Sequence, residues 1–465
     1  QLIPEENESH FVRALSAPQL IVFGIGVIIG AGLFSITGIA AAENAGPAIL
    51  ISFLIAGLGS CFAGLCYSEL AAMIPLSGSA YTYAYATFGE LIAWILGWDL
   101  ILEYAVGAAT VSISWSAYFI SLLEDFGISF PKYLASSPWQ HHEEGLINLP
   151  ALVITTLLTF LIIFGIKQAA RFNSFMVALK VIIIISFILL GFPYINYNNF
   201  VPFIPDNTGV FGEFGWSGIF KGAGVIFFAY IGFDAVSTVA QETKNPRRDL
   251  PIGIMGSLGV STLLYILFAF VLTGLVNYKE LATAAPVALA IDHTPYTWLK
   301  YCIKIAILAG FSSVILVLLV GQSRIFYTMA KDGLIPNELS KLHPKFKTPW
   351  LINWLLLILT GTFGAFLPIS VVGHMTSIGT LFAFIVVTLG VCVLRYEFPK
   401  IRRPFKTPFL PFVAFMSLLT CGLMMLSLGA SNWIRLIVWL IIGLFIYVFY
   451  NLKVIFLSWV IFLHK

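Results

Sequence analysis

Long apolar stretches separated by short polar ones run along almost the whole chain. Twelve of them approach or exceed the ~20 residues that a helix needs to cross the hydrocarbon core of a bilayer. They cover residues 17–41, 47–73, 84–118, 149–166, 172–194, 215–240, 251–276, 297–326, 350–368, 373–395, 408–429 and 432–458. These stretches do not alternate between apolar and polar residues, as the strands of a membrane β-barrel would. The pattern therefore predicts an all-α integral membrane protein with 12 transmembrane helices in the lipid bilayer.

A short motif recurs in two of these predicted spans. The sequence GIGVI at residues 24–28 returns as GAGVI at residues 222–226, in the first and the sixth span. A shift of five spans gives the two copies opposite orientations, as an inverted repeat of five helices plus five helices would. Glycine pairs such as Gly26 and Gly30 also serve close helix packing, so both interpretations stay open on this pattern alone.

Gly30-Ala31-Gly32 lies near the centre of the first span, and an apolar helical pattern resumes after it. A helix interrupted there would free backbone N–H groups at the start of its outer half, where they favour an anion. Glycine lets the backbone turn and lets a ligand approach closely. Freed backbone groups are tolerated in a bilayer only where they line a cavity. We therefore expect a site for a carboxylate at mid-membrane.

The matching break in the sixth span falls at residues 228–232, where it would expose carbonyl oxygens. Carbonyl oxygens suit an ammonium group, which has only donors. The two breaks together would offer donors and acceptors side by side. This combination predicts a site for an α-amino acid.

The composition supports a membrane protein and gives its orientation. Hydrophobic residues make up 59% of the chain and charged residues 10%, against roughly 25% charged in a soluble domain. With a cytoplasmic N-terminus, the loops after spans four, six, eight and ten face inwards, and they carry most of the Lys and Arg residues. Loops enriched in Lys and Arg lie in the cytoplasm, so both termini are expected on that side. The chain is expected to be a multi-pass protein of the cell membrane. We take these charges as signs of orientation and expect no nucleic-acid partner.

Lys180 lies about nine residues into the fifth span, ~13 Å deep at the helical rise of 1.5 Å per residue. A charge at that depth calls for a reason. It could tie its helix to backbone carbonyls of a neighbour, or act as an ion surrogate or proton carrier, and these interpretations are compatible. The five cysteines show no metal-ligand spacing, so no metal site is expected.

Acidic residues occur at three further positions of interest. Asp99 and Glu103 are four apart and share one face of the third span, where either could face the cavity or bond to polar groups in the bundle. Asp234 follows the second break; it could cap the outgoing half-helix, which we prefer, or face the substrate side chain. Leu318 is expected to pack, unless its helix lines the pocket.

Four stretches resemble the amino acid–polyamine–organocation superfamily, specifically its cationic amino acid transporter branch. They are GIGVIIGAGLF (24–34), residues 77–104, residues 227–254 and GQSRIFYTMAKDGLIP (321–336). The resemblance extends over nearly the whole chain. It implies a LeuT-type fold with broken helices 1 and 6: a cytoplasmic segment (1–16), a first five-helix repeat (17–194), an inverted second repeat (195–395) and two additional helices, 11 and 12 (396–465). Since the chain ends after its twelfth predicted span, the resemblance implies a bacterial member.

The resemblance also implies roles for individual residues. Ala31 and Gly32 would hold the substrate carboxylate, with Gly30 shaping the turn. Lys180 would stand where sodium-coupled relatives hold a sodium ion, which implies proton coupling or no ion coupling. The carbonyls that hold the amino group would be those of Ile28, Phe228, Ala229 and Ile231. The positions near the substrate side chain would be Glu103, Asp234 and Leu318, with Phe228 as a gate.

We expect a secondary active transporter that takes up small neutral or cationic L-amino acids with protons by alternating access. A bulky Leu318 favours a small neutral substrate such as alanine, whereas Glu103 and Asp234 favour a cation. Exchange of one amino acid or amine for another is an alternative, and a membrane amino acid sensor is a further one. No nucleotide-binding, zinc-protease or serine-hydrolase motif is present, so we expect no enzyme and no cofactor beyond the proton. The oligomeric state is left open.

Overall fold

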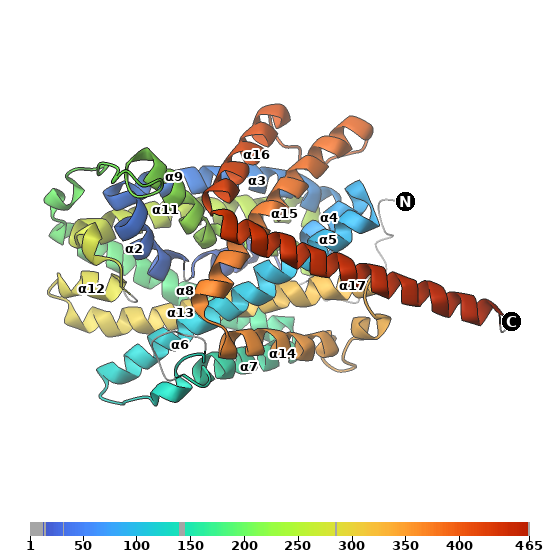
Figure 1. The fold of residues 1–465 in the computed structure, drawn as a ribbon, viewed down its shortest axis with the longest axis horizontal. Coiled ribbons are helices and arrows are strands. Elements are labelled where there is room, and N and C mark those ends of the chain that lie inside the picture. The colour runs from blue at the N-terminus through green and yellow to red at the C-terminus, as the bar shows by residue number, and fades with distance from the viewer. Residues whose placement is uncertain (1–12, 14, 31, 139–144, 284–285, 464–465) are drawn as a thin grey trace.

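The computed structural model describes residues 13, 15–30, 32–138, 145–283 and 286–463. Within these ranges the chain folds into helices that pack into one bundle (Figure 1). The described residues form no strand, and their extended pairing is limited to one parallel bridge between Leu15 and Thr243. The expectation of an all-α protein is therefore confirmed for this part of the chain.

The helices follow one another with short connections. In the first half they are α1 (Ala17–Ile28), α2 (Thr37–Ala40), α3 (Ile49–Met73), α4 (Ser79–Phe88), α5 (Glu90–Ile101), α6 (Gly107–Asp125), α7 (Leu149–Ile163) and α8 (Ile166–Gly191). In the second half they are α9 (Gly215–Ile226), α10 (Ala235–Thr238), α11 (Pro246–Leu275), α12 (Pro286–Asp292), α13 (Thr297–Lys331), α14 (Trp350–Phe366), α15 (Ile369–Glu397), α16 (Leu410–Ser427) and α17 (Ala430–Leu463).

Within the described ranges, nine helical segments are long and apolar enough to cross a bilayer, and three shorter apolar helices, α1, α7 and α14, accompany them. All lie within or overlap the predicted spans. One segment, Thr37–Met73, joins the end of the first predicted span to the second. The chain turns between them at Gly46, whose φ of +60° and ψ of −146° lie outside helical geometry, and a 3₁₀ turn over Gly46–Ala48 leads into α3. The count of twelve spans and the inverted repeat stay predictions.

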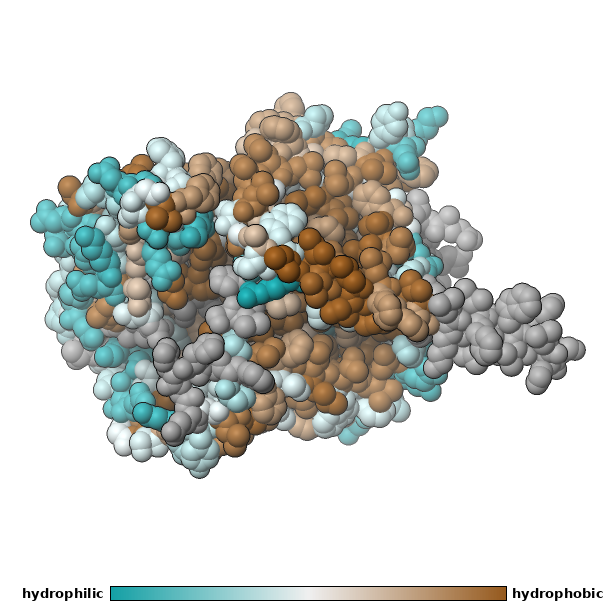
Figure 2. Space-filling view, viewed as in Figure 1, coloured by the Kyte–Doolittle hydropathy of each residue, from teal (hydrophilic) through white to brown (hydrophobic). Residues whose placement is uncertain are grey.

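The outer surface of the described part of the chain carries large apolar side chains that are exposed. Examples are Leu189 on α8, Phe415 on α16 and Ile441 on α17, each more than half exposed. Figure 2 shows the same property as a broad hydrophobic surface, with hydrophilic residues gathered mainly toward the left end of the view. Exposed apolar surface of this extent marks contact with a membrane.

One end of the bundle is closed by contacts between distant segments. The Leu15 N–H donates to the Glu242 carbonyl (2.9 Å), and the Lys244 N–H donates to the Leu15 carbonyl (2.8 Å). Glu242 in turn binds Arg324 near the end of α13 at 2.7 Å, with both side chains almost fully buried. The start of α1 is therefore fixed to the segment after α10 and to α13. We refer to this as the Glu242 end.

Candidate functional site

The first helix is interrupted where its glycines predict. α1 ends at Ile28, and Ile29 is extended, with ψ of 102°. The Gly30 carbonyl then accepts hydrogen bonds from the N–H groups of Leu33 (3.2 Å) and Phe34 (3.4 Å). A π-helical turn over Gly32–Ile36 leads into α2.

This geometry limits which backbone N–H groups of the first interruption can bind a carboxylate. The N–H groups of Leu33 and Phe34 are already bonded within the turn. Gly32 opens the turn and lines the cavity described below. Ala31, the other predicted donor, lies outside the described residues.

The second interruption follows α9. A 3₁₀ turn over Phe227–Tyr230 gives way to an extended Ile231, with ψ of 138°, and then to Gly232 at φ +103°, before α10 begins. The φ of Gly232 lies in the left-handed region that favours glycine. A Cβ there would also stand 2.4 Å from a Val27 methyl, so the position requires glycine for its conformation and its space.

The two interruptions touch each other. A Cβ added to Gly32 would stand 2.3 Å from the Ala229 Cα, so the backbones meet with no room for a methyl group. The Tyr265 hydroxyl of α11 lies 2.6 Å from the Ile28 carbonyl and 2.8 Å from the Ala229 carbonyl. The Tyr265 hydroxyl thus donates to one carbonyl from each interruption and links the two. Sequence reasoning missed Tyr265, although a tyrosine within an apolar span was a visible signal.

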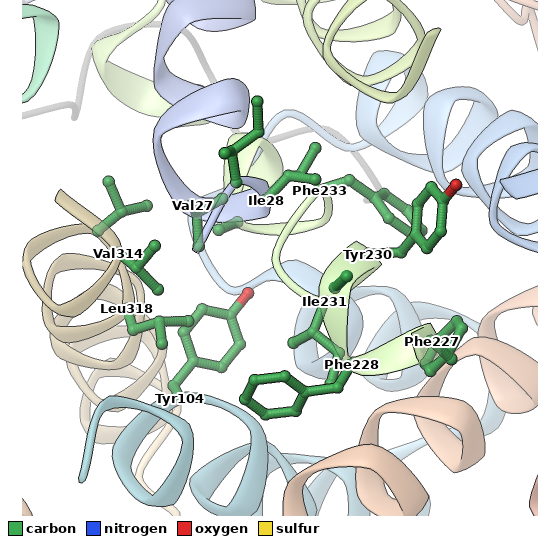
Figure 3. Close-up of a cluster of buried hydrophobic side chains, with 14 of the residues drawn as sticks. Val27, Ile28, Tyr104, Phe227, Phe228, Tyr230, Ile231, Phe233, Val314 and Leu318 are labelled. Atoms are coloured by element: carbon green, nitrogen blue, oxygen red, sulfur yellow. The ribbon is translucent and has the colours of Figure 1, made fainter. Parts of the chain in front are cut away.

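A small cavity lies where the interruptions meet. Its volume is about 20 Å³, which is room for roughly one water molecule. The lining residues are Val27, Ile28, Gly30, Gly32, Glu103, Gly107, Val111, Phe228, Ile231, Val314, Leu318 and Thr376. Figure 3 shows Val314 and Leu318 of α13 on one side, Val27 and Ile28 of α1 above them, and Phe228 and Ile231 on the opposite side.

The walls of this cavity are mostly apolar side chains. Glu103 and Thr376 are the polar side chains among the lining residues. Glu103 lies in a π-helical turn, Leu102–Val106, that interrupts the helix between α5 and α6; such turns are frequent at functional sites. Its carboxyl group lies beside Asp234 and Thr380. The cavity therefore combines backbone polar groups, one acidic side chain and an apolar enclosure.

Lys180 makes three short hydrogen bonds below the first interruption. Its ammonium donates to the carbonyls of Gly26 and Ile29, each at 2.7 Å, and to the Ser313 hydroxyl at 2.9 Å. Ser313 also donates toward the Gly26 carbonyl (2.9 Å). The structural tie expected from sequence is therefore present. Lys180 is fully buried and does not line the central cavity.

Asp234 does not cap the outgoing half-helix, so the preferred interpretation was wrong. It precedes α10, but its side chain makes no capping hydrogen bond. Instead its carboxylate accepts from the Tyr104 hydroxyl, and the Ser79 hydroxyl lies 3.4 Å away. These partners on α4 and on the π-helical turn lie far away in sequence, and they draw the carboxylate away from the backbone of α10.

The structure brings most of the predicted substrate residues together. Seven line the cavity: Ile28, Gly30, Gly32, Glu103, Phe228, Ile231 and Leu318. Two others do not line the cavity but contact residues that do: Ala229 contacts Gly32, and Asp234 lies beside Glu103. Asp99 is buried against Gly379 of α15 instead of lining the cavity. Sequence reasoning missed five lining residues: Val27, Gly107, Val111, Val314 and Thr376.

The chain is similar to known transport proteins. A family profile described as amino acid permease matches residues 15–447. The branched-chain amino acid permease BcaP of Bacillus subtilis (strain 168) is 42% identical over 449 residues, 96% of this chain and 95% of that protein. The methylthioribose transporter of the same organism is 39% identical over 97% and 96% of the two chains. Cationic amino acid transporter 1 of Arabidopsis thaliana is 35% identical over 83% of this chain and 63% of that protein.

We predict that Gly32→Ala abolishes measurable substrate binding, because its methyl group would overlap the Ala229 backbone and push the two interruptions apart. The matched control is Gly259→Ala on α11, where a Cβ meets nothing within 4 Å. Ligand binding to detergent-purified protein, with size-exclusion profiles to verify folding, gives the comparison. Wild-type affinity in Gly32→Ala would show that the contact between the interruptions does not shape the site.

Proposed function

The chain belongs to the amino acid permease family of the amino acid–polyamine–organocation superfamily, and from that premise we propose that it imports neutral L-amino acids together with protons. As a member of this family it is a multi-pass membrane transporter and not an enzyme. The observation that carries the proposal is the cavity between two interrupted helices, which residues of both interruptions line and mostly apolar side chains enclose.

The substrate's α-amino and carboxylate groups would bind at the interruptions. Gly32, at the start of the outer half-helix, supports a carboxylate there, since N–H groups and the helix dipole both favour an anion. The carbonyls of Ile28 and Ala229 each accept from Tyr265. A carbonyl oxygen has two lone pairs, so both can also accept from a substrate ammonium group.

The side-chain pocket favours a neutral, apolar side chain. Val111, Val314 and Leu318 form apolar walls, and a charged side chain among them would lose its hydration. The similarity to the branched-chain amino acid permease points the same way. Glu103 is the group that would favour a cation, but the side chains around it in the lining are mostly apolar. We therefore propose substrates from alanine to the branched-chain amino acids.

Lys180 supports proton coupling without sodium. Its ammonium group occupies the space between the carbonyls of Gly26 and Ile29, so a metal cation there would face a fixed positive charge. Transport would require that these contacts break and form again as the protein alternates between its two open states. Loss and return of one proton at Lys180 would accompany that cycle.

The contacts at the Glu242 end support an orientation in which this end faces the cytoplasm, with both termini there. The basic residues Lys244, Arg247 and Arg248 lie just after Glu242, as expected for a cytoplasmic loop. The tie between Leu15, Glu242 and Arg324 would then close the cytoplasmic side and open when substrate is released.

The test of this function is uptake into proteoliposomes in sodium-free buffer, with and without an inward proton gradient. We predict that alanine and leucine accumulate when the gradient is present, and that arginine does not compete with them. Arginine uptake that ignores the gradient and speeds up with arginine inside would contradict the proposal and indicate an exchanger of cationic amino acids.

Leu318 gives a test of the side-chain pocket. It is 3% exposed and lines the cavity, and its Cδ1 would lie 3.5 Å from a Cβ added at Gly107. We predict that Leu318→Ser extends the substrate range to longer side chains, measured by competition against labelled alanine. The control is Leu319→Ser, which alters an equally buried neighbour that does not line the cavity. An unchanged range in Leu318→Ser, or the same change in both variants, would exclude Leu318 as the limit of the pocket.

A further inference from the structure

A second cavity lies at the Glu242 end, between the start of α1 and the start of α8. Its volume is about 400 Å³, and Gln19 and Phe23 of α1 face Arg171, Asn173 and Ser174 of α8 across it. It is therefore wide enough for a group of water molecules, and most of these residues offer polar groups to them. Nothing in the substrate site described above uses this cavity.

Asn173 lies at the buried side of this cavity. It is 2% exposed, and among the described residues its amide oxygen has no hydrogen-bond partner. A buried amide oxygen without a partner costs free energy, which a bound water molecule would recover. Its side chain lies against Gly26: a Cβ added there would stand 2.6 Å from the amide oxygen and 2.7 Å from the amide nitrogen.

Gly26 links Asn173 to Lys180. Its Cα side touches the Asn173 amide, while its carbonyl accepts the Lys180 ammonium at 2.7 Å. On α8 the two residues are seven apart, about two turns or ~10 Å along one helix face. Between them on that face lies Val177, which is buried and apolar. Asn173 is thus the buried polar side chain of α8 on the cavity side of Lys180, and Val177 lies between the two on this face.

We propose that this cavity is the aqueous route by which Lys180 exchanges its proton with the cytoplasm, and that Asn173 binds the water that connects them. This role rests on the proposed proton coupling and orientation. When the inner half of α1 moves away from α8, the carbonyls of Gly26 and Ile29 leave the ammonium group. Water held by Asn173 then accepts one proton from Nζ, which leaves a neutral amine and a hydronium ion in the cavity.

No other ionisable side chain contacts Lys180 among the described residues, since its hydrogen-bond partners are two carbonyls and one hydroxyl. α1 carries no charged residue. On α13, Lys304 binds Asp125 and Arg324 binds Glu242. The remaining charged residues on these helices are Lys167 and Arg171 of α8, Lys300 and Lys331 of α13, and Arg247, Arg248 and Asp249 of α11.

The test separates proton release from substrate movement. Exchange of labelled for unlabelled alanine at equal pH needs no net release of the proton, whereas gradient-driven accumulation does. We predict that Asn173→Leu, which keeps the size but removes the amide, lowers gradient-driven uptake about tenfold, the effect of one lost buried hydrogen bond. Exchange at equal pH should stay within about twofold of wild type, since α1 and α8 still pack.

Two further variants make the result specific. Asn173→Ser keeps a polar group and should recover most gradient-driven uptake. Asn353→Leu alters a buried asparagine on α14 and should change neither measurement. Equal losses of uptake and exchange in Asn173→Leu would assign it a structural role and overturn the inference, as would no loss in either. If uptake by the wild-type protein does not depend on the proton gradient, the proposed coupling itself is wrong. If wild-type uptake depends on the gradient and Asn173→Leu behaves in the same way, only the inference about Asn173 is wrong.

Discussion

The Lys180 ammonium group, held by the carbonyls of Gly26 and Ile29, is the interaction on which the rest of the site depends. An interrupted helix in an apolar bundle leaves carbonyls without their helical partners, and each unsatisfied group is costly there. Lys180 and Ser313 supply donors to the end of α1, and Tyr265 supplies one to Ile28 and Ala229. Donors from α8, α11 and α13 thus make the interruption of α1 stable, and a cavity can lie beside it.

The same arrangement explains why the cavity is small and apolar. Gly32 lets the two interruptions meet at the Ala229 backbone, so little space remains beyond the polar groups. The side chains that close that space come from α6 and α13, and most are aliphatic. Backbone groups would bind what all amino acids share, while the aliphatic walls would select among side chains. Glu103 departs from this pattern: it is the acidic side chain of the lining, and it lies beside Asp234 and Thr380.

The sequence predicted those features that depend on local pattern. Glycines in apolar spans located both interruptions, and a lysine deep in a span located the tie to α1. The sequence did not predict Tyr265 or the π-helical turn at Leu102–Val106. Both depend on partners that are remote in sequence. For the same reason the preference for a capping Asp234 was wrong: Tyr104 and Ser79 meet its carboxylate only after the bundle has folded.

The most direct test of this account is alanine accumulation by Lys180→Met in proteoliposomes, measured against the size of an imposed pH gradient in sodium-free buffer. Methionine keeps much of the length of lysine but cannot carry a proton. Accumulation by the wild type should rise with the gradient, and accumulation by the variant should not. Lys304→Met, which removes the other lysine that is buried among the residues with described side chains, should respond as the wild type does. Accumulation by Lys180→Met that follows the gradient as the wild type does would contradict the account.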